Sequence, residues 1–296
     1  MPREGGGDTT DQHFDQMHRG ELGLALLTHV NFALRGKMAL RRSAYRYYEH
    51  RLANALPREG LPRHIGVILD GHRRFAREVT DGEYKKSYEV GMAKLEELLQ
   101  WCAELEIKAV TAWVLSTENL RRPAAELDPY FSVLTDLFNR LPQLAARLHF
   151  SLSVSGSLDL LPPELALAAK RAVDEVAQIP DPQMDVNIAL CYGGRQEVVD
   201  ACRSLVTDLV ESGVAASELA ESIDAEGLAR NLYAADLPDI DLVIRTSGES
   251  RLSGFLLWQS AFAEFAFVDP YWPAFRRVDL LRALRDFTRR ERRFGA

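Results

Sequence analysis

Short apolar runs alternate with longer amphipathic stretches from His64 onward. The apolar runs, which have the length of buried strands, lie at 65–69, 109–115, 150–154, 186–190, 242–244 and 264–268. The stretches between them have helical spacing and lie near 84–105, 129–147, 164–178, 195–212, 225–234 and 279–293. This alternation predicts an α/β fold with a mostly parallel central sheet of about six strands flanked by helices.

The first 62 residues lie outside this alternation. Residues 1–19 are polar and contain three consecutive glycines, which predicts a disordered tail. The sequence predicts a basic helical segment at residues 20–62. It predicts the main domain at residues 63–296. The apolar stretch 22–34 is too short to span a bilayer and lacks the features of a signal peptide, so we expect a cytoplasmic protein. Residues 22–46 suit either a helix on the inner face of the membrane or one that packs on the domain or on a second subunit.

Charge is unevenly distributed along the chain. The formal net charge of −7 argues against a nonspecific nucleic-acid binder, which needs a basic surface. Residues 35–63 nevertheless hold eight Lys and Arg against two acids, and 276–296 hold eight Arg against three acids. Three cysteines are too few for a disulfide framework, and their spacing is not that of metal ligands.

Unusual polar residues follow the predicted strands, and parallel sheets bind ligands at the carboxyl ends of their strands. The first strand ends in Asp70-Gly71, and Arg73, Arg74 and Arg77 follow where a helix begins. Helix amides and arginines suit a phosphate group, and Asp70 can hold a divalent cation. Strand-Asp-Gly is also a common turn, so this segment alone leaves a purely structural interpretation open.

Three further strand ends have the same character. They are Ser116-Thr117-Glu118-Asn119 with Arg121 and Arg122, Tyr192-Gly193-Gly194-Arg195, and the loop from Arg245 to Ser253 with Arg251. Together these segments predict a cationic cleft for one or two phosphorylated ligands. The sequence contains no P-loop, no dinucleotide-binding glycine motif and no HExxH zinc pair. The apolar helix near 84–105 would place an apolar wall beside the phosphate loop, which suits an amphiphile such as a prenyl diphosphate.

These motifs resemble those of the cis-prenyltransferases, the Z-type isoprenyl diphosphate synthases that include undecaprenyl diphosphate synthase. The resemblance rests on His64-Ile65-Gly66-Val67-Ile68-Leu69-Asp70-Gly71, on the three segments above, and on Arg251-Leu252-Ser253-Gly254-Phe255-Leu256-Leu257-Trp258-Gln259 followed by Glu264 and Trp272-Pro273. It implies that 63–296 is a catalytic domain with a hydrophobic tunnel, and that the protein is a homodimer. It also implies a Mg²⁺-dependent condensation of isopentenyl diphosphate with an allylic diphosphate.

The resemblance assigns a role to each matching residue. Asp70 and Glu264 should hold Mg²⁺, and Asp70, His72, Ser116 and Asn119 are the expected catalytic residues. Gly71, Arg73, Arg74, Phe75 and Arg77 should surround the allylic diphosphate, and Arg245, Arg251 and Ser253 should bind isopentenyl diphosphate. Glu118, Arg122 and Arg195 are expected to make further substrate contacts.

The chain departs from the family pattern at three positions. His72 replaces the usual Asn, and either a base or a donor to phosphate is expected there. Phe75 replaces the usual Trp, and Tyr88 replaces the His of the long-chain enzymes. Tyr88 and the amino-acid sequence around Ser116 favour the short-chain branch of the family, which makes (2Z,6E)-farnesyl diphosphate from geranyl diphosphate. Tunnel-blocking side chains are then expected at Met92, Leu95 and Leu99.

Two alternatives remain open from the sequence. A long-chain enzyme would make decaprenyl or undecaprenyl diphosphate for a glycan carrier lipid. A non-catalytic subunit of the same fold would lack the metal-binding Asp and the arginines of the cleft. The presence of Asp70, Arg245, Arg251 and Glu264 favours catalysis over the second alternative.

Overall fold

The computed structural model describes residues 47–57 and 59–290 of a chain that divides into two compact units, Met1–Ala55 and Leu56–Ala296. In the first unit, residues 47–55 form a helix. The predicted tail 1–19 and the basic stretch 22–46 lie outside the described residues. Within the described part of the chain, no helix has the length and apolar character needed to cross a bilayer.

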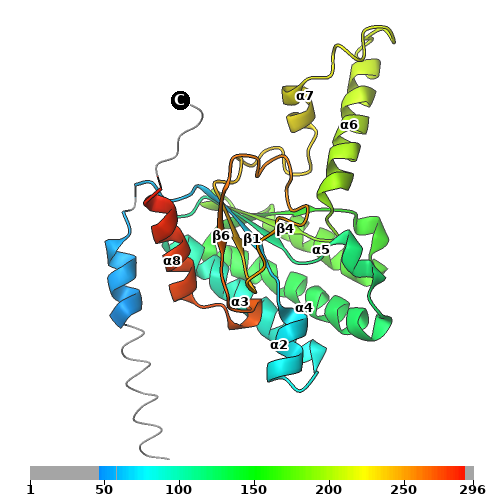
Figure 1. Ribbon diagram of the computed structural model, residues 1–296. Coiled ribbons are helices and arrows are strands. Elements are labelled where there is room, and N and C mark those ends of the chain that lie inside the picture. The colour runs from blue at the N-terminus through cyan, green and yellow to red at the C-terminus, as the bar shows by residue number, and fades with distance from the viewer. Residues whose placement is uncertain (1–46, 58, 291–296) are drawn as a thin grey trace, which may run out of the picture. The chain divides into compact units, whose positions relative to one another are not determined.

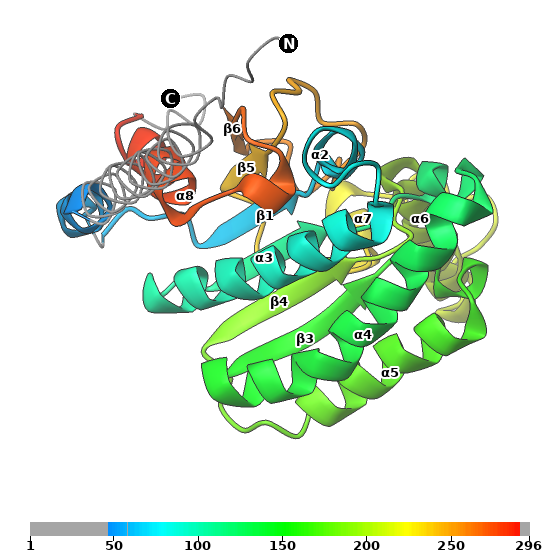
Figure 2. The ribbon, with the colours of Figure 1, turned by 90° about the horizontal axis from the view of Figure 1, so that it is seen from below.

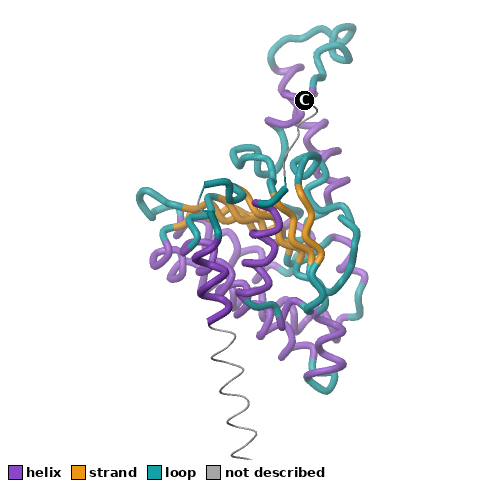
Figure 3. The backbone as a smooth tube through the Cα atoms, turned by 60° about the vertical axis from the view of Figure 1, so that its left-hand side comes forward, coloured by secondary structure: helices purple, strands orange, loops and turns teal. Residues whose placement is uncertain are grey.

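Six parallel strands form the centre of the second unit, as the sequence predicts (Figures 1 and 3). They are β1 (His64–Ile68), β2 (Ala109–Trp113), β3 (Phe150–Ser155), β4 (Met184–Ala189), β5 (Leu242–Arg245) and β6 (Glu264–Phe267). Their order across the sheet is β3-β4-β2-β1-β5-β6, and each pair of neighbours is parallel. The first strand therefore lies inside the sheet, between β2 and β5.

The middle strands are buried along their whole length. All five residues of β1 and of β2 are buried, which is typical of a parallel sheet covered on both faces. Gly66 in β1 allows a close approach, because a Cβ there would lie 2.8 Å from Phe255 Cε1 and 2.9 Å from Ile240 Cδ1. The segment between β5 and β6 can therefore pack directly onto β1.

Helices connect the strands on both sides of the sheet. They are α2 (His72–Val79), α3 (Tyr84–Glu104), α4 (Ala124–Leu148), α5 (Pro163–Val176), α6 (Gly194–Glu211), α7 (Ala225–Arg230) and α8 (Arg277–Thr288), with short 3-10 turns η1 (Thr117–Arg121), η2 (Leu158–Leu160) and η3 (Trp272–Ala274). Helices α3 and α4 pack together on one face, and α5 packs on α4 and β3 (Figure 2). Helices α6 and α7 lie on the other side of the sheet (Figure 1) and pack through Ala201, Leu205 and Leu228.

The main difference from the sequence prediction concerns the start of α4. This helix begins at Ala124, five residues before the predicted start at 129. Pro123 is its N-cap, and the carbonyl of Pro123 accepts the amide hydrogen of Glu126 at 2.9 Å. Pro129, at which the predicted helix begins, lies inside the observed helix. Glu126 consequently belongs to the first helical turn.

The connections diverge at the carboxyl ends of β1 and β5. From β1 the chain passes through α2 and α3 to β2 on one side, whereas from β5 it passes to β6 on the other side. In parallel sheets such a divergence leaves a crevice in which ligands bind. The segments that begin at Asp70 and at Arg245 meet at this crevice.

Candidate functional site

Hydrogen bonds fix the turn that carries Asp70. Its amide donates to the Thr246 hydroxyl oxygen at 3.0 Å, and the Thr246 hydroxyl donates to the Asp70 carbonyl at 2.8 Å. The Gly71 amide donates to Asp70 Oδ1 at 2.7 Å. Gly71 has a φ of 104°, and a Cβ at this position would lie 2.9 Å from the Tyr271 ring, so the turn requires glycine. The Asp70 carboxylate is thereby held at the crevice.

Arg245 ends β5 and pairs with Asp70. Its side chain is only 5% exposed, and its Nη2 lies 2.7 Å from Asp70 Oδ2. Its Nη1 donates to Ser253 Oγ at 2.7 Å and also to the Arg251 carbonyl. These contacts pair both terminal nitrogens of a guanidinium whose burial without a partner would be costly. Arg245 and Ser253, two of the residues expected to bind isopentenyl diphosphate, are therefore in direct contact.

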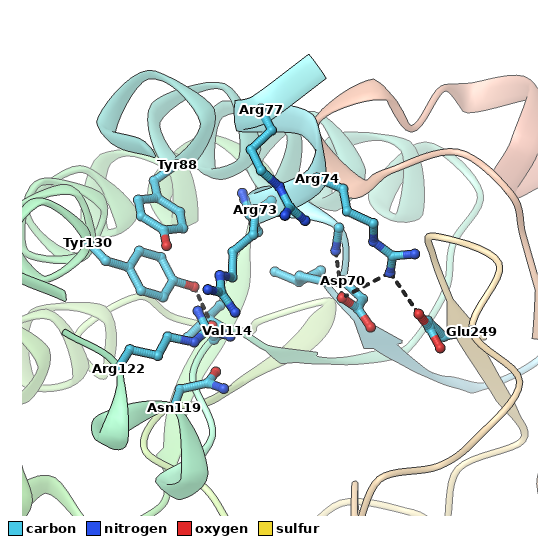
Figure 4. A pocket seen from close by; sticks show the side chains of 13 residues that line it. Asp70, Arg73, Arg74, Arg77, Tyr88, Val114, Asn119, Arg122, Tyr130 and Glu249 are labelled. Atoms are coloured by element: carbon cyan, nitrogen blue, oxygen red, sulfur yellow. Dashed lines mark hydrogen bonds and ion pairs between the residues drawn. The ribbon is translucent and has the colours of Figure 1, made fainter. Parts of the chain in front are cut away.

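A second acid, Glu249, pairs with two further arginines of this edge. Arg74 Nη2 lies 2.9 Å from Glu249 Oε1 and 3.9 Å from Asp70 Oδ1 (Figure 4). Glu249 also forms an ion pair with Arg251. Asp70 and Glu249 together therefore face the three guanidinium groups of Arg74, Arg245 and Arg251, and the cluster keeps one net positive charge.

Two adjoining cavities open at this edge of the sheet. The first, of about 390 Å³, is lined by Leu69, Asp70, Gly71, His72, Arg73, Arg74, Arg77, Tyr88, Val114, Asn119, Arg122, Tyr130 and Glu249 (Figure 4). The second, of about 190 Å³, is lined by Ile68, Leu69, Asp70, Trp113, Val114, Leu115, Ser116, Asn119, Arg122, Arg245 and Ser253. Asp70, Asn119 and Arg122 border both cavities, so these residues divide two compartments of one site.

A third cavity, of about 550 Å³, adjoins the second one at Ser253. Glu118 and Arg195 line it, together with Gly193 and Gly194 at the start of α6. The structure therefore places these two expected substrate contacts on the far side of Ser253, apart from the arginines around Asp70.

Three expected site residues lie outside the linings of these cavities. Phe75 is buried in α2, and Arg251 is largely exposed beside Glu249. Glu264 begins β6 and is paired in register with Leu242, at the amino end of β5, whereas Asp70 lies at the carboxyl end of the sheet. Its carboxylate pairs with Arg290. Within one chain, Asp70 and Glu264 are thus not brought together.

Ser116 and Asn119 form a reciprocal helix cap. The Asn119 amide donates to Ser116 Oγ at 3.2 Å, and the Ser116 amide donates to Asn119 Oδ1 at 3.3 Å. This capping box fixes the turn after β2 and holds both side chains against the second cavity. The motif is therefore a helix cap whose two side chains also line a cavity.

His72 borders the first cavity but is buried between α2 and α3. Its Nδ1 lies 3.3 Å from the Ser87 carbonyl, and a Cβ on Gly91 would lie 2.0 Å from its Cε1. Burial, and secondarily the charge of Arg122, lower the pKa of His72 to about 4. The imidazole is therefore neutral near pH 7, with the Nδ1 hydrogen directed to Ser87.

Two stacked tyrosines form the wall of the first cavity. The rings of Tyr88 and Tyr130 are 4.1 Å apart between centroids and inclined by 23°. The Tyr130 hydroxyl donates to the carbonyl of Val114, which lines both cavities. Burial raises the pKa of both hydroxyl groups, so they remain protonated. Met92, Leu95 and Leu99, the expected tunnel-blocking residues, are completely buried and are not part of the lining.

Sequence reasoning missed Tyr130 and gave no role to Glu249. Tyr130 is one of several apolar positions in α4, and the pattern contains no signal that separates it from its neighbours. Glu249 carried a signal, because an acid lies between Arg245 and Arg251 in a loop otherwise rich in donors.

The donors around Asp70 fit a magnesium ion that arrives with a diphosphate. Mg²⁺ is usually held by one or two carboxylates together with substrate phosphate oxygens and water. Asp70 borders both cavities, and Glu249 lines the first. Among residues 47–57 and 59–290, no three His, Cys, Asp or Glu side chains cluster as a self-sufficient metal site. The chain alone therefore provides part of a coordination shell.

Comparison with protein families gives a match over most of the chain. The Prenyltransf family model, which describes undecaprenyl diphosphate synthases, matches residues 68–295. This range contains the strand ends and arginines that build the cavities.

Individual relatives agree with the family model. The chain is 47% identical over 258 residues to a (2Z,6E)-farnesyl diphosphate synthase of Mycolicibacterium smegmatis, covering 86% of this chain and 97% of the relative. It is 45% identical over 258 residues to a short-chain Z-isoprenyl diphosphate synthase of Mycobacterium bovis, with the same coverage. Among solved structures, lavandulyl diphosphate synthase from Lavandula x intermedia in complex with dimethylallyl diphosphate has a TM-score of 0.74 and 30% identity, covering 80% of this chain and all of that one.

Proposed function

The chain belongs to the undecaprenyl diphosphate synthase family of prenyltransferases, and on that premise we propose that it is a short-chain cis-prenyltransferase. It condenses isopentenyl diphosphate with an allylic diphosphate, preferably geranyl diphosphate, to give (2Z,6E)-farnesyl diphosphate. The observation that carries the proposal is the pair of adjoining cavities divided by Asp70, each bordered by arginines.

The first cavity suits the allylic diphosphate. Arg73, Arg74 and Arg77 project from α2 into it, and its far wall is aromatic (Figure 4). The phosphates would face these arginines and the first amides of α2, while the hydrocarbon chain would face Tyr88 and Tyr130. Mg²⁺ held by Asp70 would withdraw charge from the leaving diphosphate. Oriented guanidinium groups stabilise the same charge as it develops in the transition state.

The second cavity suits isopentenyl diphosphate. Arg245 and Ser253 border it and already contact each other, which presents a cation and a hydroxyl to one diphosphate. Arg251 follows close by in the same loop. Ser116 and Asn119 line the same space, where the two hydrocarbon ends would meet. Attack of the isopentenyl double bond on the allylic carbon expels diphosphate, and loss of one proton then leaves the new Z double bond.

His72 acts in this proposal as a neutral wall residue of the allylic pocket. Its lowered pKa and its contact with Ser87 disfavour a cationic donor to phosphate. The alternative role as a base remains testable through the pH dependence of the rate, discussed below.

The aromatic wall supports a short product. Tyr88 and Tyr130 stack on each other in the wall of the first cavity, and Tyr130 is held by the Val114 carbonyl. A long-chain synthase would need an open path at this place. The names of the M. smegmatis and M. bovis relatives support the same choice over a decaprenyl or undecaprenyl product.

A product assay tests this function. Purified protein is incubated with labelled isopentenyl diphosphate and with dimethylallyl, geranyl or farnesyl diphosphate, and the dephosphorylated products are separated by chromatography. We expect one C15 product from geranyl diphosphate, its loss when EDTA removes divalent cations, and its recovery on addition of Mg²⁺. Mainly long products would refute the short-chain assignment. Asp70→Ala serves as the inactive control.

Two further expectations of the family belong to the same proposal. We propose a homodimer, and we propose that residues 22–46 contact the inner face of the cell membrane. Deletion of residues 1–46 should then abolish cosedimentation with anionic vesicles while leaving prenyl transfer intact. Unchanged sedimentation with the vesicles would eliminate membrane contact through this segment.

A further inference from the structure

A buried carboxylate lies directly behind the wall of the first cavity. Glu126, in the first turn of α4, is 5% exposed at its side chain. Its Oε2 lies 3.2 Å from Arg73 Nε, and its Oε1 lies 3.2 Å from Arg122 Nη1. The Tyr88 hydroxyl donates to Oε1 at 3.3 Å. Three donors therefore converge on one acid.

The donors come from three different elements. Arg73 belongs to α2, Tyr88 to α3, and Arg122 follows η1, while Glu126 belongs to α4. All three donors line the first cavity, whereas Glu126 does not. The acid therefore touches the lining of the first cavity only through the side chains it holds.

We propose that Glu126 is a positioning residue that orients Arg73 and Arg122 toward the allylic diphosphate. The inference rests on the proposed function, since it assigns these two arginines to that substrate. Each guanidinium has five N–H donors, so contact with Glu126 leaves donors of both residues for phosphate oxygens. The carboxylate fixes which donors remain directed into the cavity.

Glu126 has two opposing effects on diphosphate binding. Its negative charge weakens the positive potential of the cavity, which disfavours an anion. It also holds together two like charges from separate elements and saves the substrate the cost of ordering them. Arg73 is 54% exposed at its side chain and would turn toward solvent without this partner. We expect the ordering effect to prevail, because a diphosphate must be contacted by both guanidinium groups at once.

The test is Glu126→Gln, which keeps the shape and removes the charge. We expect the KM for geranyl diphosphate to rise about tenfold, as for loss of a charge-assisted contact, while the KM for isopentenyl diphosphate stays within about twofold. The dissociation constant of inorganic pyrophosphate, measured by calorimetry, should rise by about the same factor. Glu96→Gln is the matched control, because Glu96 on α3 pairs with Arg140 on α4 at 2.8 Å, outside the cavity linings.

Each other outcome overturns the inference. Tighter binding of geranyl diphosphate would show that Glu126 merely competes with phosphate for the arginines. Equal increases in both KM values, or a lower melting temperature with unchanged KM, would show a purely structural role. Should Glu126→Gln fail to fold, Glu126→Asp keeps the charge but shortens the reach, and an unchanged KM for geranyl diphosphate in that variant would refute the proposal.

The controls separate this inference from the proposed function. Wild-type protein that transfers no prenyl group would refute the function, whatever the variants do. In that case the pyrophosphate affinities of the wild type, Glu126→Gln and Glu96→Gln still decide whether Glu126 orders an anion site.

Discussion

At the scale of single residues, acids of the same chain hold the arginines of the site in place. Arg245 is fixed by Asp70 and Ser253, and Arg74 is held by Glu249. Arginine suits such positions because its planar fork can contact two groups at once, whereas lysine offers one compact charge on a flexible stem. A site ordered in this way loses little entropy when a diphosphate binds.

Replacement of Arg245 tests this ordering. Arg245→Lys keeps the charge but cannot contact Asp70 and Ser253 with two nitrogens of one rigid group. We expect kcat/KM for isopentenyl diphosphate to fall at least about tenfold, in steady-state assays at saturating geranyl diphosphate. Arg140→Lys, in an exposed pair with Glu96, is the matched control. Equal activity of the Arg245 variant and the wild type would contradict the role of the fork.

The role of His72 is tested by pH. Burial disfavours the charged form and lowers the pKa of His72 from the usual value of an imidazole to about 4, so the ring is neutral above about pH 6. A nearby cation would lower this pKa further, in the same direction. We expect His72→Asn to leave the shape of the kcat/KM profile between pH 6 and 9 unchanged. An acid limb near pH 6 to 7 that disappears in the variant would identify His72 as a base.

At the scale of elements, the contact between α2 and α3 sets one wall of the first cavity. The His72 ring packs against Gly91, where α3 has no side chain, and the Trp272 indole donates to the Gly91 carbonyl at 2.7 Å. A glycine in a helix interior normally weakens the helix relative to alanine. Here it permits the close approach of two helices and of the segment after β6.

This packing predicts that Gly91→Ala destabilises the protein although alanine is the better helix former. Its Cβ would lie 2.0 Å from His72 Cε1, so we expect the free energy of unfolding to fall by about 1–3 kcal/mol. The smaller side chain of His72→Asn should relieve the clash, and a double-mutant cycle measured by denaturant unfolding should show coupling of about 1 kcal/mol. Additive effects of the two changes would contradict the predicted contact.

The elements also show what the sequence could predict. All six strands were predicted because buried parallel strands are short apolar runs with polar ends. The start of α4 was wrong, because Pro129 resembles a first-turn proline while Pro123 is the actual cap. The grouping of Arg73, Arg122 and Tyr88 around Glu126 could not be predicted, since it depends on how four elements are packed. Asp70 and Arg245 were predictable because Asp70 follows β1 and Arg245 ends β5.

At the scale of the molecule, the negative net charge of the chain is compatible with a positively charged site. The chain carries a formal charge of −7, yet the first two cavities collect arginines from three distant stretches, 70–77, 116–122 and 245. Local potential is set by these few groups, and distant surface acids are screened by solvent and salt. The net charge therefore argues against a nonspecific nucleic-acid binder, which needs an extended basic surface, but it is compatible with a diphosphate ligand.

The edge of the sheet at β6 exposes aromatic side chains. Phe262 and Phe267 are 75% and 45% exposed, and β6 is the last strand of the sheet on that side. Exposed aromatic side chains at a sheet edge mark a surface for another chain, and the proposed homodimer would cover them. Burial of a phenylalanine stabilises by about 2–3 kcal/mol, so replacing both by serine should raise the dimer dissociation constant at least about a hundredfold in sedimentation equilibrium. Leu160→Ser and Leu167→Ser, at exposed apolar positions of η2 and α5, should leave the dimer intact. A dimer that survives both phenylalanine substitutions would place its interface elsewhere.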